Sequence, residues 1–295
     1  MRKSLLTAGL TFLLCNTAFG KYEHGVKIGT TPSGVKENSG MAYSETYKRF
    51  YYINDGGNGN YLFVSTMKGS LLDKVKVKGS RNRDWEGLAY GPCGDKKCIY
   101  IGDIGDNSES RPYHDIYVVK EREYYGSKVN IDNKIRYSYA DGDRPNAESI
   151  AIHPISGDLF IASKEYGKGT TVIYRIKYAD FNGKSSPEVK AYPVAKIRYK
   201  ALKNISQEKG YTAAMSISPS GEKFLLITAQ SYHAWEFNID LSKTNTFTME
   251  DAKTNFKAIP VDYLGQEESV EYLTENEFIY SSEGRNAAII QVSTK

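Results

Sequence analysis

Three glutamates share one local setting in this chain, because each opens a segment whose apolar residues are typical of a β-strand. They are Glu86, Glu148 and Glu268. If the fold gathers them around one axis, their carboxylates would lie roughly 6 Å apart, and each pair would repel by about 3 kcal/mol at an effective dielectric near 20. The protein must then protonate a carboxylate, pair it with a cation such as Lys164 or Arg285, or bind a metal ion.

The loops near these glutamates are rich in oxygen ligands. Asp103 ends a predicted strand and begins the run Asp103-Ile104-Gly105-Asp106-Asn107. Ca2+ takes six to eight oxygen ligands in flexible geometry, and loops without histidine suit it better than zinc or copper. We therefore expect a Ca2+ site with the ligands Glu86, Asp103, Glu148 and Glu268. The alternative is that each glutamate only accepts amide hydrogen bonds at its own strand, and that Asp106 and Asn107 bond their own turn.

Two kinds of function fit such a site. In a binding module, the rim would hold a glycan, another small polyhydroxylated ligand or a protein partner through Asp84, Trp85, Lys164, Glu283 and Arg285. Trp85 would either stack on a flat ligand face or pack between elements of the fold. In a metal-dependent hydrolase of an ester, lactone or phosphoester, the cation would act as Lewis acid and Glu86 or Glu148 as base. We favour binding over hydrolysis.

Other functions have less support in the residues. Glycoside cleavage by two opposed carboxylates needs a separation that a sequence does not give, and a purely structural scaffold stays open. The chain has no nucleophile elbow, no phosphate-binding glycine loop and no histidine beside a serine and an acid. The net charge is +4, and no basic block is interleaved with aromatics, so we expect no nucleic-acid partner.

The elements that must position these residues form a repeat. One phrase occurs five times: a small or acidic residue is followed by a small residue and then by an apolar one. Its copies begin at Ser39, Glu86, Glu148, Ala213 and Glu268. Intervals of about 50 to 65 residues, each containing up to four strand-like segments, are typical of a β-propeller. We predict an all-β fold with a single propeller of five blades; a sixth blade within 190–210 is the alternative.

The last repeat lacks an outer strand, and residues 22–30 contain a spare one. If that N-terminal strand pairs with the last repeat, the ring closes and no sheet edge is left exposed. This closure predicts that the two ends of the chain meet in one blade.

The first residues are expected to be removed. Arg2 and Lys3 precede an apolar stretch that is too short to span a membrane, and Ala18-Phe19-Gly20 offers small residues for cleavage. Residues 1–20 are therefore predicted to be a signal peptide and 21–295 a single propeller domain, exported to the periplasm or secreted, with no transmembrane segment. In that oxidising setting Cys93 and Cys98 are expected to form a disulfide, worth at most about 2 kcal/mol because its loop is small.

Several of these motifs together resemble a known group of proteins. The motifs are Asp84-Trp85-Glu86-Gly87, Asp103-Ile104-Gly105-Asp106-Asn107, Ala147-Glu148-Ser149 and Gln266-Glu267-Glu268-Ser269. They resemble a group of secreted bacterial β-propeller proteins that carries these phrases in this order. The resemblance runs from about residue 38 to the C-terminus, and it implies a propeller fold and export but no activity.

More distantly, the layout is similar to the calcium-dependent lactonase propellers of the gluconolactonase and paraoxonase type. Those proteins place a glutamate, asparagines and an aspartate around a central calcium that polarises an ester carbonyl. The similarity implies comparable parts for Glu86, Asp103, Glu148 and Glu268. The predicted ring here is richer in glutamate than in asparagine and has five blades instead of six, so we do not transfer the lactonase activity.

Overall fold

A computed structural model describes residues 23–165, 169–199, 202, 211–230, 232–245 and 254–294. Strands dominate these residues, and the helix α1 (Tyr178–Phe181) has 4 residues. The predicted signal peptide, 1–20, lies outside the described residues, and so does most of 200–210, where a sixth blade was the alternative. Among the described residues, no helix has the length and apolar character needed to cross a membrane.

The described strands form five four-stranded blades, each ordered here from the innermost strand outward. Blade 1 contains β2 (Asn38–Ser44), β3 (Arg49–Asn54), β4 (Tyr61–Thr66) and β5 (Leu71–Lys78), with β9 (Lys128–Asn130) added beside β5. Blade 2 contains β6 (Trp85–Cys93), β7 (Lys96–Asp103), β8 (His114–Lys120) and β10 (Asn133–Tyr139). Blade 3 contains β11 (Ala147–Ile152), β12 (Leu159–Ser163), β13 (Thr170–Ile176) and β14 (Glu188–Arg198). Blade 4 contains β15 (Thr212–Ile217), β16 (Phe224–Thr228), β17 (His233–Phe237) and β18 (Phe256–Pro260), and blade 5 contains β19 (Glu267–Thr274), β20 (Glu277–Ser282), β21 (Ala288–Ser293) and β1 (Val26–Thr30).

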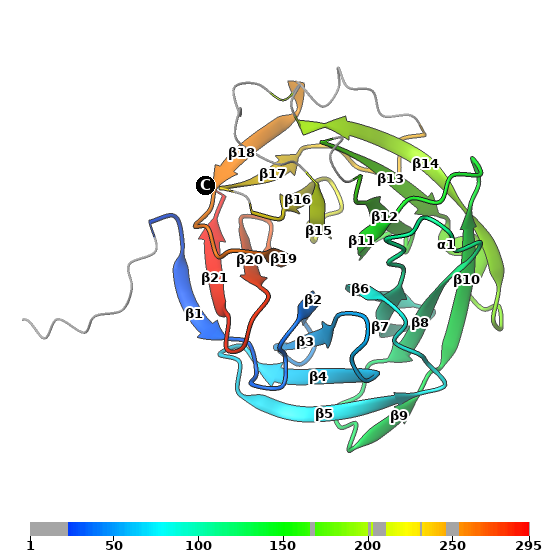
Figure 1. Ribbon diagram of the computed structural model, residues 1–295, viewed down its shortest axis with the longest axis horizontal. Coiled ribbons are helices and arrows are strands. Elements are labelled where there is room, and N and C mark those ends of the chain that lie inside the picture. Colours follow the sequence, from blue (N-terminus) through cyan, green and yellow to red (C-terminus); the bar gives the residue numbers. More distant parts are fainter. Residues whose placement is uncertain are drawn as a thin grey trace, which may run out of the picture.

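The blades surround one central axis (Figure 1). Each innermost strand contacts the innermost strand of the next blade, in the cyclic order β2, β6, β11, β15, β19 and back to β2. The predicted all-β propeller with five blades is therefore confirmed. The alternative sixth blade is not formed by the described part of 190–210, where β14 serves as the outer strand of blade 3.

The ring is closed by the N-terminal strand, as predicted. β1 pairs antiparallel with β21, with Val26 opposite Gln291 and Thr30 opposite Ala288. Blades 2 and 3 are also joined at their outer edges, where β10 and β14 run parallel. Both contacts satisfy backbone groups that an exposed strand edge would leave unpaired.

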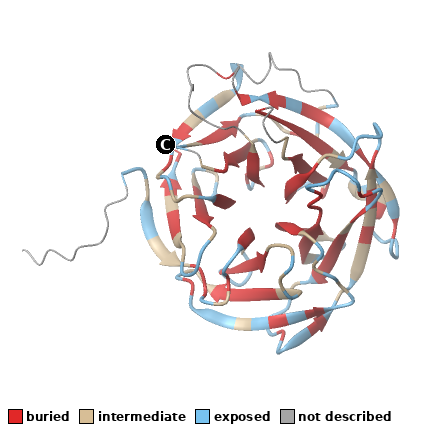
Figure 2. Cartoon of the chain, in the orientation of Figure 1, coloured by how far each residue is buried: buried red, intermediate tan, exposed pale blue. Residues whose placement is uncertain are grey.

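The hydrophobic core is divided among the blade interfaces. The described buried residues form five clusters, and each cluster takes its members mainly from two neighbouring blades. The inner strands are almost fully buried, whereas an outer strand such as β5 alternates exposed and buried residues, as expected for a sheet with one wet face (Figure 2). Packing between blades therefore holds the innermost strands at fixed positions around the axis.

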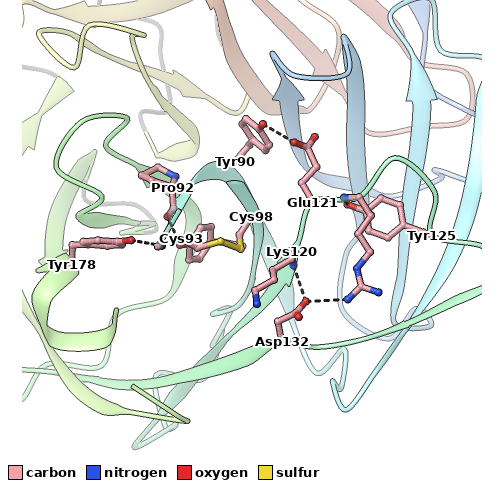
Figure 3. The surroundings of a disulfide bond; sticks show 12 residues. Tyr90, Pro92, Cys93, Cys98, Lys120, Glu121, Tyr125, Asp132 and Tyr178 are labelled. Carbon is pink, nitrogen blue, oxygen red and sulfur yellow. Dashed lines mark hydrogen bonds and ion pairs between the residues drawn. A yellow bond between two sulfur atoms is a disulfide. The ribbon is translucent and has the colours of Figure 1, made fainter. Parts of the chain in front are cut away.

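The predicted disulfide is present. Cys93 and Cys98 join β6 to β7 at the end of their hairpin, with their Cα atoms 5.8 Å apart (Figure 3). The Tyr100 hydroxyl donates to the Pro92 carbonyl at 2.6 Å, and the Gly94 amide donates to the Tyr178 hydroxyl at 2.6 Å. The hairpin lies at the opposite end of β6 from Glu86, so the disulfide is remote from the predicted site.

Candidate functional site

A β-bulge lies at the start of every innermost strand. In each blade the pairing with the second strand steps over one residue. The five residues stepped over are Ser39, Glu86, Glu148, Ala213 and Glu268. A bulge leaves one residue out of the ladder and redirects side chains. The repeated phrase in the sequence thus begins at these bulges, and its three glutamates belong to one ring at one end of the central channel, here called the mouth.

Glu86 belongs to a tight group of three acids in this mouth. Asp55 directly follows β3, Asp84 directly precedes β6, and each of the three residues offers a carboxylate oxygen within 4.8 Å of the others. Burial, with the charges of Asp55 and Glu148, raises the pKa of Asp84 to about 6. Burial, with Glu148 and Asp55, raises the pKa of Glu86 well above its usual range. Like charges at this spacing favour either a bound proton or a bound cation.

Two glycines make room for these acids. A Cβ on Gly105 would overlap the Asp84 carboxylate and lie 2.8 Å from Cγ of Glu86, and a Cβ on Gly56 would overlap the other oxygen of Asp84. Gly105 is the central residue of the run that begins at Asp103. The run therefore needs glycine there because the loop backbone lies directly against the carboxylates.

The structure gives Asp103 a basic partner. Nη1 of Arg111 lies 3.2 Å from Oδ1 of Asp103 and donates to the Gly105 carbonyl at 2.7 Å. Asp103 also accepts the Asp84 amide at 3.0 Å. Burial raises the pKa of Asp103, and Arg111 opposes that shift. Asp103 thus braces the loop that places Asp84 and Gly105.

Asp106 bonds its own loop, the alternative that the sequence left open, whereas Asn107 bonds a residue of the next blade. Asp106 accepts the Arg111 amide at 2.6 Å and the Ser108 hydroxyl at 3.0 Å. Asn107 is exposed and accepts the Asn146 side chain at 3.2 Å.

Glu148 is also paired. Its Oε2 lies 3.0 Å from Nζ of Lys164, and its Oε1 accepts the Asn146 side chain at 2.9 Å. Burial alone would lower the pKa of Lys164, but Glu148 and Glu268 outweigh it and raise that pKa. Burial also raises the pKa of Glu148, against the pull of Lys164. We treat the pair as ionised at neutral pH because the two charged groups are in direct contact.

Glu268 and Glu283 lie on the blade 5 side of the mouth. Burial, with the charge of Glu148, raises the pKa of Glu268 to about 8. Within the described residues no donor makes a hydrogen bond to its carboxylate. Glu283 is half-buried, and burial together with Asp55 and Glu37 raises its pKa. The mouth is therefore an acidic surface whose charges interact across four blades.

The remaining predicted rim residues differ in their surroundings. Trp85 is 0% exposed, its indole N–H donates to the Arg81 carbonyl at 2.7 Å, and its ring packs against Tyr117. It fills the interface between blades 1 and 2, the packing alternative, and has no free face for a ligand. Arg285 is exposed in the turn after β20.

Asp55 was not among the expected ligands, although the sequence pattern places it at the same rim. It directly follows the second strand of its blade, a position equivalent to the ends of the strands that supply Asp103 and Glu283. That shared position was the available signal, because second strands return to the face at which innermost strands begin.

No family model matches the chain, and no curated protein sequence matches it. Solved structures of similar shape include the PQQ-bound aldose sugar dehydrogenase of Streptomyces coelicolor, at 10% identity and a TM-score of 0.46, with 94% of this chain and 98% of that chain covered. A nidogen/laminin complex matches at 12% identity and a TM-score of 0.46, covering 84% and 73%. A hydrazine synthase of Kuenenia stuttgartiensis matches at 15% identity and a TM-score of 0.42; 85% of this chain is covered, but the match spans 57% of the other chain. These neighbours include propeller-type proteins.

Proposed function

We propose that the mouth binds Ca2+ and that the protein is an exported, calcium-dependent binding module for a glycan or another polyhydroxylated ligand. The observation that carries this proposal is the group Asp55, Asp84 and Glu86, whose carboxylate oxygens lie within 4.8 Å of one another. The disulfide between Cys93 and Cys98 supports export, because such bonds persist in oxidising compartments.

The donor set fits a hard divalent cation. The three acids supply oxygen only, and Ca2+ accepts six to eight oxygens from carboxylates, carbonyls and water. Asp55 and Asp84 are partly exposed, which leaves room for solvent or for ligand hydroxyls in the coordination shell. A bound ion would also offset the mutual repulsion that raises the pKa of Asp84 and Glu86.

The acids of the mouth differ in whether a basic side chain is paired with them. Lys164 is paired with Glu148, and Arg111 with Asp103. Among the described residues, none of the three acids of the group is in an ion pair. The expected ligands Glu148 and Asp103 therefore act better as outer braces, and Asp84 and Asp55 join Glu86 as the proposed inner ligands.

Thermal unfolding with excess Ca2+ and with a chelator tests the metal site. An ion that binds only the folded state raises the midpoint by about 5–10 °C when its concentration is about 100-fold above Kd. Asp84→Asn should lose most of that rise. Asp95→Asn is the matched control, because Asp95 is exposed in the β6–β7 turn, far from the mouth. Identical curves with Ca2+ and chelator would contradict the proposal.

A second candidate is a metal-dependent hydrolase of an ester, lactone or phosphoester. Glu268 favours it, because a carboxyl with a pKa of about 8 stays protonated at neutral pH and suits a general acid. Chromogenic substrates of each class, with and without Ca2+, test for turnover. Glu268→Gln and Glu86→Gln should remove any activity found, whereas Asp95→Asn should keep it; no turnover on any class would leave only the binding module.

A further inference from the structure

The channel has a second polar feature, at the end opposite the mouth. In four blades the third residue after the bulge is small: Ala42, Ala89, Ala151 and Ser216. In the fifth blade the same place holds Glu271. A single carboxyl thus enters a ring of alanine and serine, at a position where the other blades leave space.

Glu271 lies in a defined polar setting. The Ser216 hydroxyl donates to its Oε2 at 3.0 Å, and the Tyr43 amide also hydrogen-bonds to the carboxylate. Burial raises the pKa of Glu271 to about 8. Among the described residues, no lysine, arginine or histidine forms an ion pair with it.

A cavity of about 90 Å³ lies beside this carboxyl. Its wall includes Glu271 and Ser216, with apolar and aromatic neighbours such as Ala89, Tyr90, Ile150 and Ile217. It reaches the surface near Glu45 and Lys97, which pair with each other at 3.1 Å. One buried water needs only about 10–15 Å³ of such volume, so the cavity has room for a ligand of several heavy atoms.

We propose that this cavity is a second binding site, which takes a primary alkylammonium group with its nitrogen against Glu271 and Ser216. Glu271 is partly buried, and a charge-assisted hydrogen bond to a carboxylate is among the stronger polar contacts in proteins. The apolar part of the wall, with Ala89, Ile150 and Ile217, suits a short alkyl chain. A metal ion fits less well, because one carboxylate and one hydroxyl give few of the oxygens that Ca2+ requires.

Binding should be coupled to proton release. The ammonium needs a carboxylate, so a protonated Glu271 must give its proton to solvent when the ligand binds. Other titratable groups at the cavity are Glu45, Lys97, Tyr43, Tyr90 and Tyr272. Burial raises the pKa of Tyr90 and of Tyr272 further above neutrality, so these two stay uncharged. Affinity should therefore fall about tenfold for each pH unit below about 8.

Calorimetric titration of the full chain with ethylammonium chloride at pH 9 tests this site. We expect saturable binding that is at least tenfold weaker in the isosteric variant Glu271→Gln. The matched control, Glu86→Gln, changes the mouth only and should bind ethylammonium like the wild type, with or without chelator. Ethanol, which is similar in size but uncharged, should not bind.

Absence of saturable binding in the wild type, equal affinity in Glu271→Gln, or equal binding of ethanol would each overturn the proposal. If Glu271→Gln does not fold, the pH dependence of ethylammonium affinity in the wild type tests the proposal instead. A tenfold loss per unit below pH 8 supports the site, and affinity independent of pH overturns it. Because Glu86→Gln alters only the mouth, the two sites are tested separately. Failure of ethylammonium binding therefore does not bear on the calcium proposal.

Discussion

Single side chains decide which acids of the mouth have a basic partner among the residues that the structure describes. Arg111 and Lys164 contact Asp103 and Glu148, whereas Asp55, Asp84 and Glu86 lie against one another. The sequence predicted that glutamates would converge and repel. It named Lys164 as a possible partner but did not predict which acids are paired. Arg111 reaches Asp103 within the β7–β8 loop, and Lys164 follows the strand paired with the one that carries Glu148. A strand pattern does not specify loop conformation or side-chain direction.

Burial of these acids predicts a pH dependence of stability. The pKa of Glu268 rises from 4.5 to about 8 on folding, so its contribution is fully present below pH 4.5 and is lost as the pH rises through about 8. In chelator, urea unfolding should show a free energy of unfolding that falls by about 2–5 kcal/mol between pH 5 and 8. Glu268→Gln should reduce this slope without abolishing it, because burial also raises the pKa of Glu271 to about 8 and that of Glu86; Asp95→Asn should leave the slope unchanged. A free energy independent of pH would show that Glu268 titrates normally.

The close approach of Gly105 to the acids gives a second prediction. In Gly105→Ala the new methyl group meets Asp84 and Glu86, so the loop must move and the acids must separate. Overpacking of this kind costs about 1–3 kcal/mol. The calcium-dependent rise in melting temperature should also shrink. Asn107→Ala, in the same loop but exposed, should keep that rise. An unchanged rise in Gly105→Ala would exclude a close contact between this loop and the bound ion.

At the scale of elements, the bulge explains the repeated phrase. The first residue of each phrase is the unpaired one, and the second is small because neighbouring innermost strands approach closely. A Cβ on Gly40 would lie 2.8 Å from the Leu88 amide, and one on Gly87 would lie 2.8 Å from the Ile150 amide. The phrase therefore combines the requirements of a bulge and of a narrow channel. The sequence shows the resulting residue pattern, and the structure shows its cause.

The closing strand gives an element-scale prediction. A chain that begins at Thr31 lacks β1 and leaves β21 as an exposed edge of blade 5. We expect its melting temperature to fall by about 5 °C or more and its tendency to aggregate to rise. A chain that begins at Lys21 retains β1 and serves as the control. Equal melting temperatures and equal light scattering in the two chains would show that β1 contributes little to closure.

At the scale of the whole molecule, the ring shares its core among all five blade interfaces. Removing one blade would expose two apolar surfaces, so we expect the described blades to unfold together. The two ends of the channel nevertheless differ: the mouth gathers acids from several blades, whereas toward the far end Glu271 takes the place that Ala42, Ala89, Ala151 and Ser216 hold in the other blades.

Two tryptophans can test this cooperativity. Trp85 lies between blades 1 and 2, and Trp235 lies between blades 3 and 4. Trp85→Phe and Trp235→Phe each leave one fluorescent reporter, and in each variant fluorescence and circular dichroism should give the same unfolding midpoint. Destabilisation by the substitution shifts both signals of a variant equally. Midpoints that differ between the two signals would show that the blades unfold in separate steps.

The sequence alone determined the features that can be read from patterns and repeats along the chain. Strand patterns, the returning phrase, the spare strand at residues 22–30 and the pair Cys93 and Cys98 predicted the fold, its closure and its disulfide. Only the tertiary structure decided that Asp55 joins Asp84 and Glu86, that Trp85 is buried, and that Glu271 lies beside a cavity. The physical reason is that the clustering of these acids and the burial of these side chains depend on distances between residues of different blades, which are set only once the blades pack around the axis.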